Sequence, residues 1–239
     1  MINFYFFHVG SDVSLPEMLV GSIKISNPKS KIYQITDNDS PEVEQLDGCF
    51  RFNGNKENIM KFRMETYSSI NIKRNENAVF LDTDMLVVRE LKEKIIFKKK
   101  DIVFCQRQFG CENLVNVDYE DLNMIEYRNM KMGEAWPYLG CFIAIRNQNP
   151  IPRMNEMYNS LDEKYKRWYG DQIALKKFAS RFPNKITFVG ENEYACVPRA
   201  LFDNKNKSRS KDVYILHFKG KNYKKIMVKS YNYLLKNRT

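Results

Sequence analysis

Residues 78–88 read AVFLDTDMLVV, an apolar run that two aspartates interrupt before apolar residues resume at once. Residues 78–81 have the composition of a strand buried on both faces of a sheet. Asp82 and Asp84 follow directly, where open α/β sheets bind ligands. Two carboxylates at i and i+2 face the same way and suit a hard divalent cation that also binds a diphosphate. The alternative, a solvated turn, fits poorly because uncompensated charge beside a core is costly.

Strand and helix patterns alternate around this stretch. Residues 2–9 (INFYFFHV) and 31–36 (KIYQIT) predict strands, and helices are expected from Ser14, as N-cap, and over 57–72. Strand, helix, strand, helix, strand is the start of a parallel α/β fold. The remaining expected elements are strands at 101–105, 138–145, 186–189 and 213–218, and helices over 154–182, with a break near Gly170, and over 231–236.

Length and composition indicate one globular domain. The chain has 239 residues, of which 43% are hydrophobic and 28% charged. No run approaches eighteen apolar residues, and the N-terminal MINFYFFHVGSD lacks the features of a signal peptide, so a cytoplasmic protein is expected. The five cysteines are scattered without CxxC spacing, which favours free thiols over disulfides or a zinc site.

The net charge of +10 is concentrated at the C-terminal end. Residues 199–239 contain twelve Lys or Arg and two Asp or Glu, so residues 1–198 are neutral. Three interpretations stay open: a solvated tail, a surface for anionic lipid headgroups, or contacts to ligand phosphates. The run 204–211 (NKNKSRSK) is expected to be a mobile loop. The basic residues expected to favour the anionic inner face of the cell membrane, as a peripheral contact, are Lys205, Lys207, Arg209, Lys211, Lys229, Lys236 and Arg238.

The chain has two histidines, and each follows an apolar strand pattern. Such a histidine is more often a core residue than a ligand. For His217, the preceding strand, four lysines between residues 219 and 225, and Gly220, which lets backbone approach a ligand, favour a metal ligand. For His8 the core interpretation leads, with the loop from His8 through Val9 to Gly10 expected against a base or ribose.

Together these motifs resemble the GT-A glycosyltransferases of the family 8 type, which includes glycogenin and bacterial lipopolysaccharide sugar transferases. The resemblance covers most of the chain. It implies a GT-A fold, an α/β architecture with a Rossmann-like, mostly parallel sheet flanked by helices. Residues 1–239 would form one domain, with 1–100 as the nucleotide-binding half, 101–198 as the acceptor and donor-sugar half, and 199–239 as the basic C-terminal segment.

The resemblance also implies roles for particular residues. Asp82, Asp84 and His217, in the segment His-Phe-Lys-Gly, would hold Mn²⁺ or Mg²⁺ against the diphosphate of a sugar nucleotide. Residues 171–175 (DQIAL) match an Asp-Gln-x-x-Leu segment near the donor sugar and acceptor, so Asp171 and Gln172 are expected to be catalytic. The residues expected at the nucleotide or donor are His8, Val9, Gly10, Asp37, Lys61, Arg63, Asp82, Thr83, Gly140, Gly220, Lys221 and Lys224.

Two positions depart from the family pattern. The lysine expected six residues after the histidine is Tyr223 here, so Lys221 or Lys224 would contact the phosphate. Residues 138–140 (YLG) lack the usual Asn before the glycine, which leaves acceptor type and stereochemistry open. An inverting reaction would need Asp171 or Glu134 to deprotonate the acceptor, whereas a retaining one needs no base. Asp171 has a further interpretation, as the N-cap of the helix QIALKKFA.

The expected activity is a metal-dependent glycosyltransferase, a hexosyltransferase. It would move a sugar from a nucleotide-diphosphate sugar, with a UDP-sugar as the expected donor, to a glycan or lipid-linked glycan in bacterial surface polysaccharide or lipopolysaccharide synthesis. One alternative, a sugar nucleotidyltransferase, favours a glycine-rich basic loop after the first strand, but VGSDVSLPE has one glycine and no lysine. The other, a nucleic-acid binder that uses the basic end, leaves the Asp-x-Asp unexplained, so no nucleic-acid partner is expected.

Overall fold

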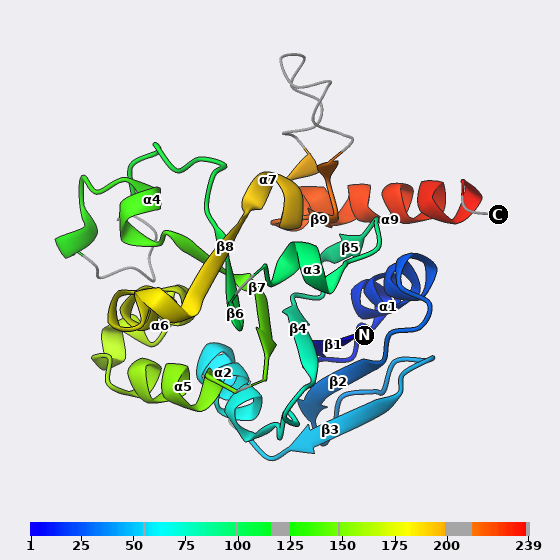
Figure 1. Cartoon of the computed structure of the whole chain (residues 1–239), viewed down its shortest axis with the longest axis horizontal. Coiled ribbons are helices and arrows are strands. Elements are labelled where there is room, and N and C mark those ends of the chain that lie inside the picture. The colour runs from blue at the N-terminus through cyan, green and yellow to red at the C-terminus, as the bar shows by residue number, and fades with distance from the viewer. Residues whose placement is uncertain (55, 99, 116–124, 148, 199–211, 238–239) are drawn as a thin grey trace.

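The computed structural model describes residues 1–54, 56–98, 100–115, 125–147, 149–198 and 212–237, which form one large sheet covered by helices (Figure 1). The seven strands run in the order β3-β2-β1-β4-β7-β6-β8. Neighbours pair in parallel except that β7 is antiparallel to both β4 and β6. The expected α/β class with a mostly parallel, helix-flanked sheet is therefore confirmed. The strands are β1 (Ile2–Phe7), β2 (Ile32–Asp37), β3 (Gly48–Phe52), β4 (Asn77–Leu81), β6 (Ile102–Gln106), β7 (Tyr138–Arg146) and β8 (Ile186–Gly190).

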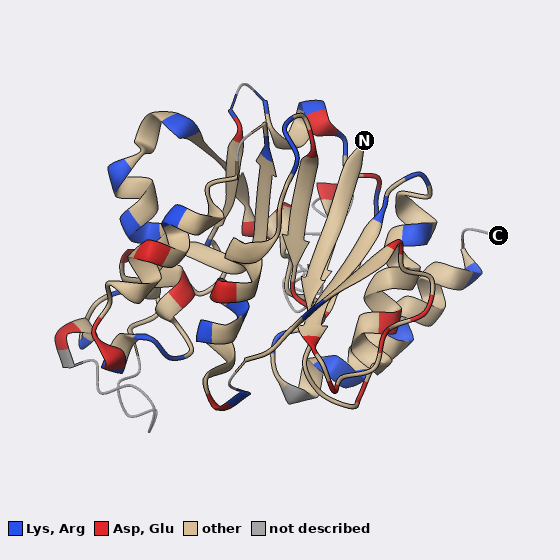
Figure 2. Cartoon of the chain, turned by 90° about the horizontal axis from the view of Figure 1, so that it is seen from below, with Lys and Arg blue, Asp and Glu red and all other residues tan. Residues whose placement is uncertain are grey.

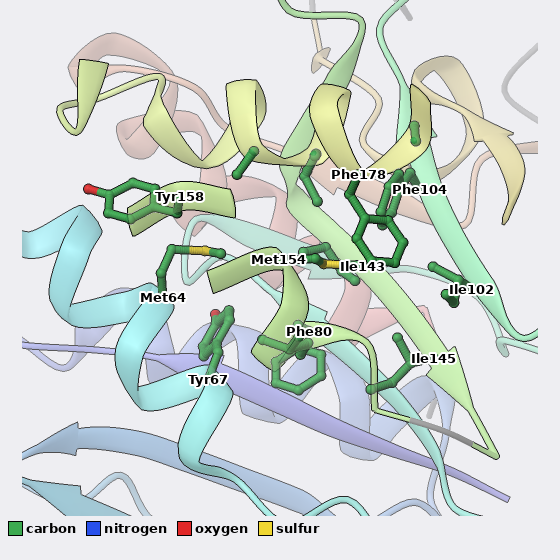
Figure 3. Close-up of a cluster of buried hydrophobic side chains, with 14 of the residues drawn as sticks. Met64, Tyr67, Phe80, Ile102, Phe104, Ile143, Ile145, Met154, Tyr158 and Phe178 are labelled. Carbon is green, nitrogen blue, oxygen red and sulfur yellow. The ribbon is translucent and has the colours of Figure 1, made fainter. Parts of the chain in front are cut away.

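The central strands are buried on both faces, as their apolar sequences predict. In β4, Ala78 and Phe80 point to one core, whereas Val79 and Leu81 point to the other. Three helices cover the first face, where Figure 3 shows Phe80 beside side chains from those helices. They are α2 (Ile59–Ser69), α5 (Ile151–Asn159) and α6 (Gly170–Arg181).

The second face is covered by helices and by a separate two-stranded sheet. This small sheet pairs β5 (Met85–Val87) with β9 (Ile215–His217) in antiparallel fashion. Helix α9 (Lys221–Lys236) contacts α1 (Ser14–Ser26) through an apolar cluster that includes Met18 and Met227. The remaining helices are α3 (Glu93–Ile96), α4 (Met132–Ala135), α7 (Glu191–Tyr194) and the 3₁₀ turns Lys56–Asn58, Ile125–Tyr127, Glu163–Tyr165 and Pro183–Lys185.

Several element boundaries differ from the sequence-based prediction. Ser14 is not the cap of α1, because Val13 holds that position and Asp12 accepts the Ser14 N–H at 3.0 Å. The helical pattern over 154–182 is two helices separated by residues 160–169. Strand β3 was not predicted, since it is a half-exposed edge strand without a continuous apolar run. The last helix begins at residue 221 rather than 231.

The first turns of α9 carry a helical periodicity of apolar residues that the surrounding lysines make hard to recognise in the sequence. Tyr223, Met227 and Tyr231 recur every four residues and form the side of α9 that packs on the protein. Gly220, at φ +82°, ends the extended segment just before the helix. The helix is therefore amphipathic over its whole length, and only its last turns matched the prediction.

Charge and hydropathy follow this architecture. In Figure 2 the strands are mostly uncharged, and the basic and acidic residues lie on helices and loops. Among the described residues, no helix is long and apolar enough to cross a membrane. The basic run 204–211 lies outside the described residues.

Two buried serines of α1 hold the outer edge of β5. Ser22 accepts the Val87 N–H at 3.0 Å and donates to the Leu19 carbonyl, and Ser26 donates to the Val87 carbonyl at 3.0 Å. The other edge of β5 pairs with β9. Both sides of Val87 therefore have hydrogen-bond partners in the core, which fixes β5 and the residues just before it.

We predict that Ser22→Ala lowers the free energy of unfolding by about 1–3 kcal/mol, because it leaves the buried Val87 N–H without an acceptor. Ser230→Ala is the control, since that exposed hydroxyl donates only to a carbonyl of its own helix. Urea denaturation of both variants measures the difference. Equal stability of the two would show that the serine does not hold β5.

Candidate metal and nucleotide site

The pairing of β5 with β9 brings together residues far apart in the sequence. Met85 lies opposite His217 in this ladder, so the residue before β5 meets the end of β9. The Phe218 N–H donates to the Asp84 carbonyl at 2.9 Å, and His217 Nε2 lies 3.2 Å from Asp84 Oδ1. The register of two short strands thus places the expected histidine beside the expected aspartate.

Asp82, Asp84 and His217 form a cluster whose ligand atoms all lie within 4.8 Å of one another. His217 is 7% exposed, and its Nδ1 atom has no hydrogen-bond partner among the described residues. Burial alone would raise the pKa of Asp84, but the hydrogen bond from His217 lowers the pKa below its ordinary value. Two carboxylates and an imidazole fit a divalent cation, and the imidazole suits Mn²⁺ better than Mg²⁺.

An arginine whose side chain is only 12% exposed links this cluster to the helix on the other side. Arg63, on α2, donates from Nη1 to Asp82 Oδ1 at 2.9 Å and from Nη2 to Asp171 Oδ2 at 2.5 Å. Burial raises the pKa of Asp171 above its ordinary value, and the Arg63 guanidinium partly opposes that rise. Asp171 does not cap α6, because the helix begins at Gly170 without a side-chain cap bond. The capping interpretation is therefore wrong, and the carboxylate instead pairs with Arg63 at the cavity wall.

Gly140 makes this approach possible. Because β7 is antiparallel, its first residues lie at the same edge of the sheet as the carboxyl ends of β4 and β6. A Cβ atom at Gly140 would come within 1.8 Å of Asp171 Oδ2 and 3.2 Å of Arg63 Nη2. The glycine therefore leaves the space in which the ion pair between Arg63 and Asp171 forms.

A cavity of about 450 Å³ opens beside these groups. A larger hollow of about 960 Å³ lies at the opposite end of β1, beside Met1, and contains none of the clustered ligands. The residues that line the smaller cavity are Met60, Arg63, Asp82, Asp84, Arg107, Leu139, Gly140, Cys141, Trp168, Tyr169, Asp171, Gln172, His217, Lys219, Gly220 and Lys224.

Arg107 is a site residue that the sequence analysis missed. It directly follows β6, and its Nη2 donates to Gln172 Oε1 at 2.7 Å, while its Nε donates to the Trp136 carbonyl at 2.8 Å. The rule that identified Asp82, a polar residue just past a buried strand, applies equally to Arg107. Gln172, on α6, is thus held at the cavity wall by the residue that follows β6.

Lys219 lines the cavity on the metal side and is held by a buried carboxylate. Glu191 is fully buried; its Oε1 lies 2.6 Å from Lys219 Nζ, and its Oε2 accepts the N–H groups of Gln108 and Phe109. This pairing ties β9 to the loop after β6. It also fixes a positive charge two residues after His217.

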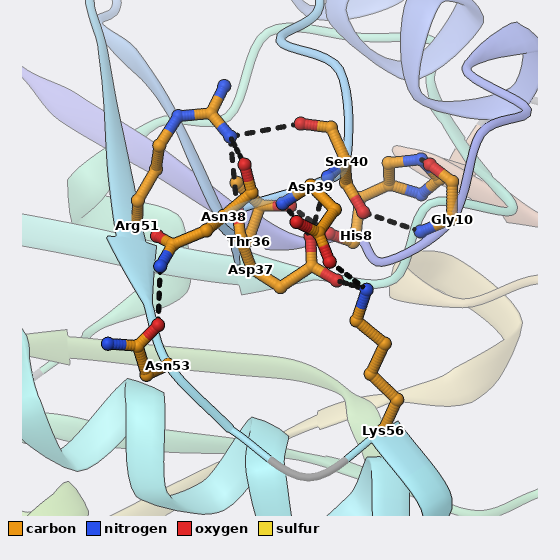
Figure 4. Close-up of polar contacts among 10 residues, drawn as sticks. All are labelled: His8, Gly10, Thr36, Asp37, Asn38, Asp39, Ser40, Arg51, Asn53 and Lys56. Carbon is orange, nitrogen blue, oxygen red and sulfur yellow. Dashed lines mark hydrogen bonds and ion pairs between the residues drawn. The ribbon is translucent and has the colours of Figure 1, made fainter.

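The ends of β1 and β2 form a second polar region along the same edge (Figure 4). Asp37 accepts the Ser40 N–H at 2.7 Å and pairs with Lys56 Nζ at 2.7 Å. Burial opposes ionisation, but the bonds from Lys56 and Ser40 prevail and lower the pKa of Asp37 to about 2. Burial is the main cause of the lowered pKa of His8, whose Nε2 lies 3.1 Å from the Gly10 carbonyl oxygen. His8 is half-buried rather than a core residue.

The structure brings together most of the expected site residues but not all of them. Val9, Gly10 and Thr83 lie at the same sheet edge but do not line the cavity. Lys61 is half-exposed, lies outside the cavity and is 3.9 Å from Glu65. Lys221 is the first residue of α9. The expected residues that do line the cavity are Arg63, Asp82, Asp84, Gly140, Asp171, Gln172, His217, Gly220 and Lys224.

Only part of the expected membrane-facing set falls within the described residues. Lys229 and Lys236 are exposed on α9. Lys205, Lys207, Arg209, Lys211 and Arg238 lie outside the described residues. A peripheral contact with anionic membrane, and a location at the inner face of the membrane, therefore stay predictions.

We predict that Gly140→Ala destabilises the protein by about 1–3 kcal/mol, the usual range for overpacking, because the new methyl group displaces the Asp171 carboxylate. Adding Asp171→Ala should recover part of this loss, since it removes the atom that clashes. A double-mutant cycle by urea denaturation measures the coupling. Additive effects of the two substitutions would contradict the close approach.

Comparison with known proteins leaves the geometry of the site as the basis for any assignment. The chain matches no protein-family model, and no curated protein matches it. The site is an edge of a mostly parallel α/β sheet. It has three clustered candidate metal ligands, a largely buried arginine between two carboxylates, and a cavity beside them.

Proposed function

We propose that the protein is a divalent-metal-dependent glycosyltransferase of the GT-A, family 8-like type. Its donor would be a nucleotide-diphosphate sugar, with a UDP-sugar as the expected one, and its acceptor a glycan. The observation that carries this proposal is the cluster of Asp82, Asp84 and His217 at the wall of the cavity. Hard oxygen ligands with one imidazole suit Mn²⁺ or Mg²⁺, which commonly also bind phosphate oxygens.

The other charged groups at the cavity fit the departure of a diphosphate. The cation, when bound, would supply positive charge at the leaving diphosphate. Lys219 is held in place by Glu191, and Lys224 lies on the first turn of α9 at the cavity. Fixed positive charges in a partly enclosed site stabilise a developing anion without reorganising, which is the type of catalysis that this reaction needs.

The strand order supports separate subsites along one edge. The polar ends of β1 and β2 lie on one side of the metal cluster at β4, and Arg107, at β6, lies on the other. We assign the first side to the base and ribose, around His8 and Asp37, and the second to the sugar and acceptor. This agrees with the expected division into a nucleotide half and a sugar half.

Asp171 is the carboxylate best suited to act on the sugar or the acceptor. One of its oxygens is bound by Arg63, and the other, Oδ1, makes no hydrogen bond of normal geometry to the described residues. Burial raises the pKa of Asp171, which favours proton acceptance from an acceptor hydroxyl in an inverting reaction. Glu134, the other candidate base, does not line the cavity, so we give it no role.

We predict that Asp82→Asn or Asp84→Asn abolishes Mn²⁺-dependent stabilisation by UDP while the fold is retained, because each change removes a ligand charge and no core volume. Nucleotide thermal shifts, with and without Mn²⁺, measure this effect. Asp162→Asn, at an exposed aspartate outside the cavity, is the matched control. His217→Ala should weaken Mn²⁺ and UDP binding together.

Sugar transfer or donor hydrolysis by the wild type that is unchanged in EDTA would contradict the metal assignment. A screen of nucleotide sugars for metal-dependent hydrolysis supplies the activity for that comparison. If His217→Ala lowers stability but leaves UDP affinity in Mn²⁺ unchanged, the histidine is a core residue only.

We predict that Lys219→Met weakens UDP binding in Mn²⁺ by about tenfold or more, the effect of losing one hydrogen bond to a charged group. Lys219→Arg should retain most of the affinity, and Lys225→Met, which changes an exposed lysine of α9 outside the cavity, should leave it unchanged. Isothermal titration calorimetry measures the affinities. Equal losses in the Met variants at both positions would indicate a general charge effect rather than a fixed contact.

A further inference from the structure

The chain has two tryptophans, and each comes three residues before a residue that lines the cavity. Their exposure differs sharply. Trp136 is 1% exposed, whereas Trp168 is 65% exposed and lines the cavity. A single exposed apolar residue needs no explanation on an ordinary surface. An exposed indole at the wall of a cavity that also contains the metal cluster is a different case, because it offers a large flat apolar face to a ligand.

The backbone on both sides of Trp168 is fixed. Before it, Tyr158 Oη donates to the Lys166 carbonyl at 2.6 Å. After it, the ring of Tyr169 stacks on the buried Trp136 with centroids 3.9 Å apart and planes 9° from parallel. Gly170 has no room for a side chain, since a Cβ atom would lie 2.6 Å from the Tyr165 carbonyl oxygen. The indole is therefore presented by an anchored segment, and little ordering entropy is lost when a ligand stacks on it.

Two polar side chains at the start of α6, Asp171 and Gln172, line the same cavity as the indole. Asp171 is buried and its Oδ1 has no partner of normal geometry among the described residues. Gln172 lies on the next position of α6 and is held by Arg107. A ligand that fits has an apolar face to lie on the indole and hydroxyl groups at its edge to hydrogen-bond with the polar side chains of the same cavity wall. A pyranose ring has both properties.

We propose that Trp168 is the stacking platform of a saccharide subsite, with Asp171 and Gln172 as its polar wall. This inference deepens the proposed function and rests on it for the role of the subsite, which would receive the acceptor glycan.

A nucleobase would also stack on an indole, and the strand order argues against that occupant. Trp168 precedes α6, together with Asp171 and Gln172, and Gln172 bonds to Arg107 at the end of β6. The polar ends of β1 and β2, assigned above to the base and ribose, lie beyond β4 on the other side of the metal cluster. One indole on the sugar side of that cluster is placed for a pyranose.

The test uses the tryptophans themselves, because a soluble quencher reaches Trp168 but not the buried Trp136. Acrylamide quenching of the full chain is measured with methyl glucoside, methyl galactoside, lactose, maltose and cellobiose, and in parallel with uridine. We expect at least one saccharide to reduce the quenching constant by about half at saturation, and uridine to leave it unchanged. Protection by uridine alone, or by no saccharide, overturns the proposal.

Substitutions of Trp168 then test whether an aromatic face is what binds the saccharide. Saccharide binding, followed by saturation-transfer NMR of the sugar protons, should weaken by about tenfold or more in Trp168→Ala and only a few-fold in Trp168→Phe, which keeps an aromatic face. Tyr233→Ala is the control, since Tyr233 is 70% exposed on α9 and outside the cavity. Unchanged saccharide affinity in Trp168→Ala, or an equal loss in Tyr233→Ala, overturns the assignment.

Measuring Mn²⁺-dependent UDP binding in the same proteins keeps this inference distinct from the proposed function. Trp168→Ala should retain UDP affinity while it loses the saccharide. Saccharide binding that depends on Trp168, in a protein that does not bind UDP with Mn²⁺, would refute the transferase and leave the platform standing. UDP binding with Mn²⁺ but without any saccharide binding would refute the saccharide platform and leave the proposed transferase standing.

Discussion

A single buried guanidinium, that of Arg63, holds the centre of this structure together. It bonds Asp82 at the end of β4 and Asp171 on α6, and it belongs to α2, so three elements meet at one charge. The Asp171 carboxylate, whose side chain is only 5% exposed, could not be buried at this edge without such a partner, because unpaired buried charge is costly. Gly140 completes the arrangement by leaving the space in which the pair closes. The rest of the site is arranged around this contact.

Other candidate site residues lie on both sides of Arg63 along the sheet edge. The metal cluster lies where β4 ends and β5 begins, and β9 brings in His217 and the lysine that follows it. Toward β6 the wall is formed by Arg107, Gln172 and an exposed indole. A candidate metal cluster beside a wall that offers an aromatic face and hydrogen-bonding groups fits the proposed transferase, with the diphosphate at the cluster and a saccharide at the wall.

The sequence alone was sufficient to predict the placement of residues that lie at or just past the end of a strand. Asp82 and Asp84 follow an apolar run, and His217 follows another, so their placement at the sheet edge could be predicted. Trp168 could not, because its position depends on the segment that follows α5 rather than on periodicity. Glu191 directly follows β8, so the same strand-end rule applies to it although the sequence analysis did not single it out. The reversed direction of β7, which brings Gly140 to the edge, is also a property of strand order that a local pattern does not contain.

The small sheet of β5 and β9 has a consequence for when the site exists at all. It joins residues 85–87 to residues 215–217, so the aspartates and the histidine belong to parts of the chain made at different times during synthesis. Before β9 has been synthesised, the chain contains the two aspartates but neither His217 nor Lys219. Under the proposed function, a cation held by all three side chains would bind only after β9 has paired with β5, and it would stabilise that paired form over partly assembled ones.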